Sequence, residues 1–214
     1  MYFDESSFNS WMRPTHTWGT KIEPIKLVIN ERRFSGITVY GAISPFFKHF
    51  VYMLGTSTNQ VEVSNFLIKI RQACSLTRDS HLHLIIDNHR SHMTPRVKEL
   101  AKELNMTLHF QPAYSPEFNS IESLWHILKS RVKRDLNLAN QVKFSQEKFQ
   151  LLVEKCCDSI TNEEALQQYG ANRNFVMRQL MELKQEQVMD DDLEKIVDEP
   201  LAIQPGEGQE GALD

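Results

Sequence analysis

Short apolar runs separated by polar, turn-forming segments dominate the first half of the chain, a pattern typical of β-strands. The polar segment Asn30–Arg33 separates two β-branched runs and predicts a hairpin. The run Leu82–Asp87 is too short for a helix and too apolar for an edge, so we expect a buried central strand. Altogether we expect strands at Tyr2–Asp4 (the last part of a strand), Ile25–Asn30, Phe34–Ile43, His49–Leu54, Leu82–Asp87 and Thr107–Phe110.

Helical spacing of apolar residues appears between and after the later strands. Thr94 and Pro95 are a typical N-cap and first helical residue, and Thr161–Glu164 reads as a capping box that opens another helix. A last helix is expected through Phe175–Leu183. The apolar faces are Val63, Phe66, Leu67 and Ile70; Val97, Leu100, Ala101 and Leu104; and Phe149, Leu152, Val153, Cys156 and Ile160. Three strands in a meander, then helix, strand, helix, strand and helices, predict an α/β protein with a mixed sheet flanked by helices.

Length and composition fit one domain and a tail. At 214 residues the chain is long enough for a real core. We place the domain at residues 1–185 and an acidic, disordered tail at 186–214, where acids, Gly and Pro replace apolar residues. A hydrophobic content of 41% and a charged content of 24% favour a soluble, globular protein. The absence of a membrane-length apolar run, a signal peptide or a Cys-x-x-Cys pair indicates an intracellular protein without a membrane partner.

The charge is distributed unevenly. The whole chain has a net charge of −4, but residues 182–214 hold 11 acids and 2 lysines, a net charge of −9. Residues 1–181 therefore carry a net charge of +5, from 22 basic and 17 acidic residues. A basic domain with an acidic appendage suits a nucleic-acid surface. An ordinary solvated domain with a disordered end is the alternative, and charge alone does not decide between them.

Three acidic residues stand where separate elements begin or end. Asp87 closes the apolar run Leu82–Asp87, Glu122 lies where a proline turn hands over to a helix, and Asp4 follows the apolar start of the chain. Three carboxylates on separate elements can converge on divalent metal, an arrangement that catalyses phosphoryl transfer. Their hard oxygen ligands select Mg²⁺ or Mn²⁺ rather than zinc.

The helix that follows Asn119 offers two interpretations of Glu122. In the first, Asn119 caps the helix and Glu122 is the glutamate of a capping box. In the second, Glu122 is a metal ligand at the start of a polar stripe that continues through His126, Lys129 and Lys133. Lysines along such a helix are suited to hold a phosphate backbone. A solvated face is the simpler interpretation of the lysines.

The residues around Asp87 also have two interpretations. Asp-Asn commonly ends a strand and starts a turn, yet the carboxyl edge of a buried strand is where α/β sheets bind ligands. His89 and His92 follow closely, but no cysteine or second histidine pair stands at zinc spacing. We expect His92 to orient a carboxylate or to contact a phosphate, with a surface histidine of no special role as the alternative.

Taken together, these segments resemble the DDE-type catalytic domain of Tc/mariner-superfamily transposases, which belong to the transposase and retroviral-integrase group with a ribonuclease-H-like fold. The 34 residues between Asp87 and Glu122 match the Tc-like branch. The resemblance covers about Tyr2 to Arg134. It rests on Asp87-Asn88-x-x-x-His92; on Tyr114-Ser115-Pro116-x-x-Asn119-x-Ile121-Glu122 with Trp125 and Lys129; and on Asp4-Glu5-Ser6-Ser7-Phe8 with Arg13 and Trp18-Gly19.

The sequence departs from the family pattern at several positions. His89 and Arg90 stand where the family usually has alanine and proline, Ala113 replaces the second of two prolines, and Ser120 replaces a proline. None of these changes removes a metal ligand, although Ser120 loosens the first turn before Glu122. Family members also carry N-terminal helix-turn-helix domains, and the sequence begins at the first catalytic strand. We therefore expect either an isolated catalytic domain or a truncated relic.

The resemblance implies a mixed five-stranded sheet, a helical C-terminal part and a two-metal site. Asp4, Asp87 and Glu122 would hold two Mg²⁺ (or Mn²⁺) ions about 4 Å apart, and His92, Lys129 and Lys133 would contact DNA. The implied reactions are strand cleavage at transposon ends and transfer of the freed 3′ end into double-stranded target DNA, usually at deformable TA steps. Pairing of transposon ends implies a homodimer. The location would be the nucleus in a eukaryote and the cytoplasm in a bacterium.

Two other functions remain open from the sequence. The chain could be a domesticated or decayed domain that binds DNA without cutting it, although all three acids are present. It could also be a ribonuclease-H-like nuclease that acts on RNA–DNA hybrids, which the segment from Tyr114 to Glu122 argues against. Glu5 is expected to point to the opposite face of its strand from Asp4 and to lie outside the metal site.

Overall fold

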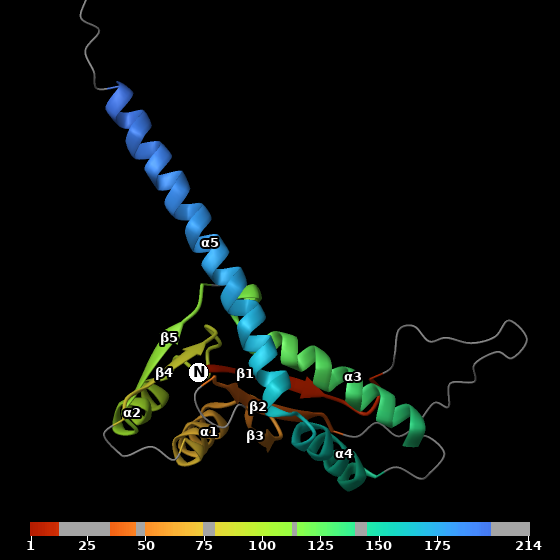
Figure 1. Cartoon of the computed structure of the whole chain (residues 1–214). Coiled ribbons are helices and arrows are strands. Elements are labelled where there is room, and N and C mark those ends of the chain that lie inside the picture. Colours follow the sequence, from red (N-terminus) through yellow and green to blue (C-terminus); the bar gives the residue numbers. More distant parts are fainter. Residues whose placement is uncertain (13–34, 46–49, 75–79, 113–114, 140–144, 198–214) are drawn as a thin grey trace, which may run out of the picture. The chain divides into compact units, whose positions relative to one another are not determined.

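The computed structural model describes residues 1–12, 35–45, 50–74, 80–112, 115–139 and 145–197. The chain divides into two compact units, Met1–Asn174 and Phe175–Asp214. The elements are β1 Tyr2–Phe8, β2 Ile37–Ile43, β3 Phe50–Gly55, α1 Gln60–Ala73, β4 Leu82–Ile86, α2 Pro95–Glu103, β5 Met106–Phe110, the short 3-10 helix η1 Pro116–Phe118, α3 Ile121–Ala139, α4 Gln146–Asp158 and α5 Asn162–Val197 (Figure 1).

The described strands form one mixed sheet in the order β3-β2-β1-β4-β5. β2 pairs antiparallel with β1 and with β3, whereas β4 runs parallel to both β1 and β5. The predicted α/β fold, a five-stranded mixed sheet flanked by helices with a helical C-terminal part, is therefore confirmed. The central position of β4 between β1 and β5 also confirms that Leu82–Asp87 contains a buried strand.

The first strand extends further than predicted. β1 was expected to end at Asp4, but it continues to Phe8, which places Asp4 in the middle of the strand. The polar residues after Asp4 stay extended because each of them pairs with a residue of β2. The predicted strand Ile25–Asn30 and its hairpin lie outside the described residues.

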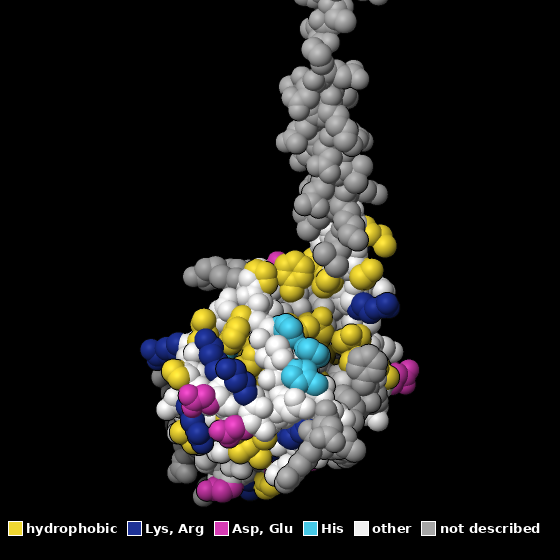
Figure 2. Space-filling view, turned by 90° about the vertical axis from the view of Figure 1, so that its left-hand side faces the viewer, with side chains coloured by type: hydrophobic (Ala, Val, Ile, Leu, Met, Phe, Trp, Pro, Cys, Tyr) yellow, Lys and Arg dark blue, Asp and Glu magenta, His cyan; other side chains and the backbone are white. Residues whose placement is uncertain are grey.

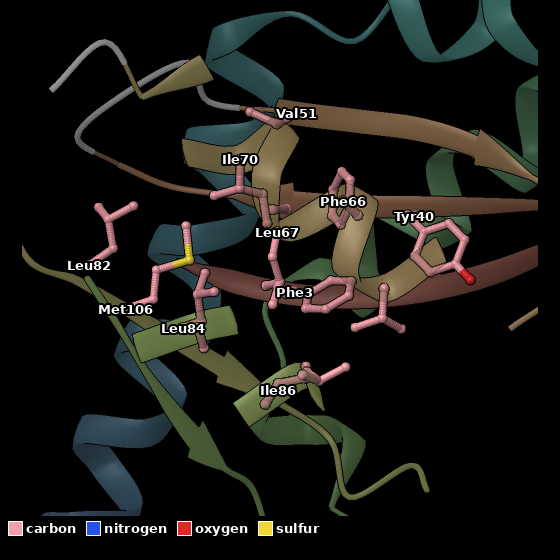
Figure 3. Close-up of a cluster of buried hydrophobic side chains, with 14 of the residues drawn as sticks. Phe3, Tyr40, Val51, Phe66, Leu67, Ile70, Leu82, Leu84, Ile86 and Met106 are labelled. Carbon is pink, nitrogen blue, oxygen red and sulfur yellow. The ribbon is translucent and has the colours of Figure 1, made fainter. Parts of the chain in front are cut away.

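Two hydrophobic cores lie on opposite faces of the sheet. On one face, Phe3 and the apolar side chains of β4 pack against α1 and α2 (Figure 3). On the other face, Phe8 and Val39 pack against α3 and α4. Alternation along β1 therefore directs Phe3 toward α1 and α2, and directs Phe8 toward α3. By the same alternation, Asp4 and Glu5 face opposite sides of the sheet.

Local capping fixes where the helices begin. The Thr94 hydroxyl accepts a hydrogen bond from the Val97 N–H at 3.4 Å, as the sequence predicts for the N-cap of α2. The capping box at the start of α5 is also confirmed, because Glu164 N–H donates to Thr161 Oγ1 at 3.1 Å and Thr161 N–H donates to Glu164 Oε2 at 3.0 Å.

The C-terminal helix is longer than expected. α5 runs without interruption from Asn162 to Val197, where the sequence predicts a separate helix through Phe175–Leu183 and disorder from 186 onward. The expectation of disorder is thus corrected for residues 186–197, whose Glu, Gln, Met, Leu and Lys side chains have high helix propensity. Residues 198–214 lie outside the described residues. Among the described helices, none combines the length and apolarity needed to cross a membrane.

Gly41 provides a direct test of the packing between the sheet and α3. It pairs with Asp4 across β1 and β2, and a Cβ atom at this position would lie 2.5 Å from Cη2 of Trp125 and 3.0 Å from Cδ1 of Ile121. We expect Gly41→Ala to lower the free energy of unfolding by about 1–3 kcal/mol, because overpacking a filled core forces side chains from their rotamers. Urea denaturation of both proteins measures this change.

Gly170→Ala is the matched control. Gly170 lies within α5, and no atom is found within 4 Å of the position that its Cβ would occupy. Alanine is preferred over glycine in helices by about 1 kcal/mol, so this variant should be at least as stable as the parent protein. Equal stability of Gly41→Ala and the parent would contradict the close packing of Trp125 on β2.

Candidate active site

The three predicted carboxylates line one cleft of about 440 Å³. Asp4 comes from the middle of β1, Asp87 directly follows β4, and Glu122 lies in the first turn of α3. Asn88, His89 and Gln111 also line the cleft. The parallel strands β1 and β4 are neighbours in the sheet, and this adjacency brings together residues that are far apart in the sequence.

Asp4 is held from the side of α3. The indole Nε1–H of Trp125 donates a hydrogen bond to Asp4 Oδ2 at 3.0 Å. Burial of the carboxyl group, together with the negative charge of Glu122, raises the pKa of Asp4 to about 7, although the Trp125 hydrogen bond acts in the opposite direction. A buried acid next to a second carboxylate is a group whose ionised form a cation would stabilise.

Asp87 is held by donors from the loop that follows β4. His92 Nδ1 lies 2.7 Å from Asp87 Oδ1, and the His89 N–H donates to the same oxygen at 3.1 Å. Burial alone would raise the pKa of Asp87, but the hydrogen bonds from His92 and from the His89 backbone outweigh it and hold this pKa below its usual value. Asp87 is therefore ionised at neutral pH.

His92 occupies the interior rather than the surface. Its side chain is 0% exposed, and its second ring nitrogen, Nε2, lies 2.7 Å from Glu5 Oε1. Burial alone would lower the pKa of His92, yet the hydrogen bonds to Asp87 and Glu5 raise it to about 10. The prediction that His92 orients a carboxylate agrees with this position, because the ring contacts Asp87. The alternative contact with DNA does not, because a fully buried ring whose two nitrogens are both occupied cannot reach a phosphate.

Glu122 is not used as the capping-box residue that the first interpretation requires. The backbone N–H of Asn119, which a capping-box glutamate would accept, donates instead to the carbonyl oxygen of Pro116 at 2.9 Å. α3 begins at Ile121, and the N–H of this residue donates a hydrogen bond to the Asn119 side chain at 3.4 Å. The Glu122 carboxylate is therefore not needed for helix capping, and Glu122 lines the cleft.

Lys129 and Lys133 lie further along α3. Both side chains are half-buried, and neither is among the residues that line the cleft. The structure thus groups the three acids but leaves the two lysines on the continuing helix. Their predicted contact with DNA stays a prediction.

Two residues near the acids had no predicted role in the site. Trp125 belonged to the resemblance only as a motif residue, and its spacing is that of an ordinary core position. Glu5 was expected to lie outside the metal site, and its side chain does point away from the cleft, but it contacts His92. Neither partner could be identified from local pattern, because the pairs Asp4–Trp125 and Glu5–His92 are separated by 121 and 87 residues.

The residues around the cleft fit a divalent metal in their chemistry. Carboxylate oxygens are hard ligands of the kind Mg²⁺ and Mn²⁺ prefer, and the mutual repulsion of Asp4 and Glu122 would be relieved by a cation between them. Within the described part of the chain, no group of three or more His, Cys, Asp or Glu side chains is already arranged to hold a metal ion.

A second group of histidines lies on the outer surface of β4 and β5. His83 Nδ1 lies 2.8 Å from His109 Nε2, and both nitrogens of His81 contact Asn105 and Thr107 at 2.7 Å. Figure 2 shows histidine side chains gathered on one face of the molecule. Because these nitrogens bond to one another and to neutral side chains, we interpret the group as surface hydrogen bonding.

The fold and the cleft together define a class of protein. A mixed five-stranded sheet with one acid on β1, one directly after the parallel neighbour β4 and one in the first turn of α3 fits a nuclease with a ribonuclease-H-like fold. The chain belongs to the DDE superfamily endonucleases, whose family model matches residues 1–145. No curated protein is significantly similar to the chain in sequence.

Solved structures show the same fold. The Mos1 mariner paired end complex with Mn has 16% sequence identity, a TM-score of 0.57, and coverage of 80% of this chain and 51% of that chain. The Mos1 strand transfer complex has 18% identity, a TM-score of 0.55, and coverage of 78% and 49%. The predicted resemblance to a DDE-type catalytic domain is confirmed by the family model, and its likeness to a mariner transposase is confirmed in the fold. The chain spans about half the length of each of these two Mos1 chains.

Proposed function

We propose that the chain is the catalytic core of a DNA transposase, which cuts DNA strands at the ends of a mobile element and joins the freed 3′ ends to target DNA. The observation that carries this proposal is the meeting of Asp4, Asp87 and Glu122 in one cleft of a DDE-family fold. Similar folds occur in a Mos1 strand transfer complex and in a Mos1 paired end complex with Mn.

Each acid has a defined part in this proposal. Asp4, Asp87 and Glu122 would hold two Mg²⁺ or Mn²⁺ ions, and the chemistry supplied by such ions would be activation of the attacking hydroxyl and stabilisation of the leaving oxygen. Trp125 orients the Asp4 carboxylate, and His92 with the His89 N–H orients that of Asp87. Asp4 has to release its proton before it can act as a ligand, because its pKa is raised to about 7.

The partners follow from the same reaction. Double-stranded DNA is the substrate, and paired transposon ends imply two copies of the chain in the active complex. The reaction would take place in the nucleus of a eukaryotic host or in the cytoplasm of a bacterial one. Lys129 and Lys133, on the helix that carries Glu122, are the candidate contacts to the phosphate backbone.

A nicking assay tests the proposed activity. Supercoiled plasmid, a short DNA duplex and an RNA–DNA hybrid are each incubated with the protein in Mn²⁺, in Mg²⁺ and in EDTA. We expect metal-dependent nicking of plasmid and duplex DNA, and no comparable cutting of RNA in the hybrid. Cutting of the hybrid alone would replace the transposase proposal with a ribonuclease. Absence of any cutting, together with retained DNA binding, would indicate a non-catalytic relic.

The two lysines are tested separately through the salt dependence of DNA binding. A plot of log K against log salt concentration has a negative slope. Each phosphate that a lysine no longer neutralises should reduce the magnitude of this slope by about 0.9. We therefore expect Lys129→Ala and Lys133→Ala each to reduce this slope by about one, measured by fluorescence anisotropy with a labelled duplex. Lys102→Ala, an exposed lysine of α2, is the control that should leave the slope unchanged. An unchanged slope in both α3 variants would contradict phosphate binding by these lysines.

A further inference from the structure

Glu5 is an ionisable residue that lies next to the candidate site but is not one of the proposed metal ligands. It neighbours Asp4 on β1 but faces the opposite side of the sheet, and its side chain is only 7% exposed. Burying a carboxylate is costly unless it is paired. Its partner is His92, which in turn contacts Asp87, so Glu5 is connected to the cleft through one imidazole ring.

This connection holds the ring from several directions. Glu5 Oε1 lies 2.7 Å from His92 Nε2, and Asp87 Oδ1 lies 2.7 Å from His92 Nδ1. The fully buried ring of Phe3 packs beside the imidazole, with a distance of 5.3 Å between ring centroids. Because both ring nitrogens are engaged, the imidazole cannot flip or rotate without losing a hydrogen bond in the interior.

The connection also determines which oxygen of Asp87 remains available. The His92 ring and the His89 N–H both reach Oδ1. This leaves Oδ2 for a ligand in the cleft that Asp87 lines. Outer groups that hydrogen-bond to a ligating carboxylate are known to fix its orientation and to strengthen metal binding.

We propose that Glu5 is a positioning residue of the active site, which acts through the buried His92 ring to hold the Asp87 carboxylate with Oδ2 directed into the cleft. This inference rests on the proposed function, since it assigns Glu5 to the same metal site. A purely structural role is a weaker explanation of the arrangement. A buried ion pair is often no more stabilising than apolar side chains of the same volume, whereas it does impose a fixed geometry.

Two substitutions of Glu5 separate positioning from stability. Glu5→Ala removes the acceptor for His92 Nε2, and Glu5→Gln keeps the shape of the side chain and a hydrogen-bonding group at the same place. Val153→Ala on α4 shortens a fully buried side chain in the other core and is the control for a general loss of stability. If Glu5→Ala does not fold, Glu5→Met replaces it, because methionine fills a similar volume without an acceptor of comparable strength.

Mn²⁺ affinity is measured by calorimetry at a temperature at which all variants are folded, and metal-free crystal structures give the orientation of Asp87. We expect Glu5→Ala to weaken Mn²⁺ binding by about 10–100-fold, as loss of an outer hydrogen-bonding partner does in other metal sites, and to release Asp87 from its present rotamer. Glu5→Gln and Val153→Ala should retain most of the affinity and the orientation of Asp87.

Some results would overturn the inference. If Asp87 keeps its rotamer in metal-free Glu5→Ala, or if Glu5→Ala binds Mn²⁺ as well as Val153→Ala does, Glu5 does not position the site. Failure of Glu5→Gln to bind better than Glu5→Ala would assign the effect to charge and not to positioning. If the unaltered protein itself binds no Mn²⁺, the proposed function fails, while the Asp87 rotamer in the crystal structures still decides the role of Glu5.

Discussion

Replacing Glu122 by glutamine is expected to reduce metal-dependent DNA cleavage by about 10³-fold or more, equivalent to about 4 kcal/mol in the activation free energy. Glutamine keeps the size of the side chain but removes the charge that a divalent ion requires. The fold should be unaffected, because the backbone N–H that a capping box would pair with the Glu122 carboxylate already donates to Pro116. Nicking of supercoiled plasmid in Mn²⁺, together with a urea denaturation curve, measures both quantities.

Glu117→Gln is the matched control for this experiment. Glu117 is an exposed glutamate in η1, five positions before Glu122, and its side chain is not among those that line the cleft. Its substitution should leave the cleavage rate close to that of the parent protein. Retained cleavage in Glu122→Gln would remove Glu122 from the metal site, and an equal loss in both variants would indicate a general electrostatic effect.

Most of the fold was predictable because its signals are local. The apolar spacing of α1 and the Thr94 cap of α2 predict these helices directly, and both are confirmed. The second half of β1 was not predictable, because Glu5, Ser6 and Ser7 are polar and become a strand only by pairing with β2. The continuity of α5 was also not predicted, because the sequence analysis expected a separate last helix through Phe175–Leu183. Gly170 costs a helix only about 1 kcal/mol, so it does not end α5.

The candidate site shows the same division between local and long-range signals. The three acids that line the cleft were predicted because each stands at a recognisable position, after an apolar run or at a helix start. The side chains that hold them were not, because hydrogen bonds such as Trp125 to Asp4 and His92 to Glu5 join distant segments. The hydrophobic pattern assigned Trp125 to the core, and period-two alternation assigned Glu5 to the opposite face. Both assignments are correct, yet neither reveals the polar atom that makes the hydrogen bond.

Asp4→Asn is expected to make the metal-free protein more stable at pH 8 and to abolish its stabilisation by Mn²⁺. Folding raises the pKa of Asp4 from 3.8 to about 7, mainly by burial and secondly through Glu122. Between about pH 4 and pH 7 the unfolded chain releases this proton while the folded chain retains it. The stability contributed by the protonated carboxyl is therefore complete below pH 4 and is lost as the pH rises through 7.

The expected size of this effect is large for a single side chain. The difference between the two pKa values corresponds to on the order of 2–4 kcal/mol at pH 8. Asparagine carries no charge at any pH, so Asp4→Asn avoids this loss. For a domain of this size we expect a melting temperature about 5–15 °C above that of the metal-free parent. At pH 4.5 the difference should be much smaller, because the parent then retains the proton.

Thermal unfolding at pH 4.5 and pH 8, with and without Mn²⁺, separates the contributions of proton and metal. At pH 8 and about 100 times its Kd, Mn²⁺ should stabilise the parent by about 2.7 kcal/mol and leave Asp4→Asn unchanged. Adding metal would then reduce or reverse the difference in stability between Asp4→Asn and the parent protein. A parent protein whose stability does not fall between pH 4.5 and pH 8 relative to Asp4→Asn would show that Asp4 is not the buried, protonated acid described above. If one variant combines high metal-free stability with no response to metal, the ionised Asp4 carboxylate destabilises the metal-free protein and is the group that the metal ion stabilises.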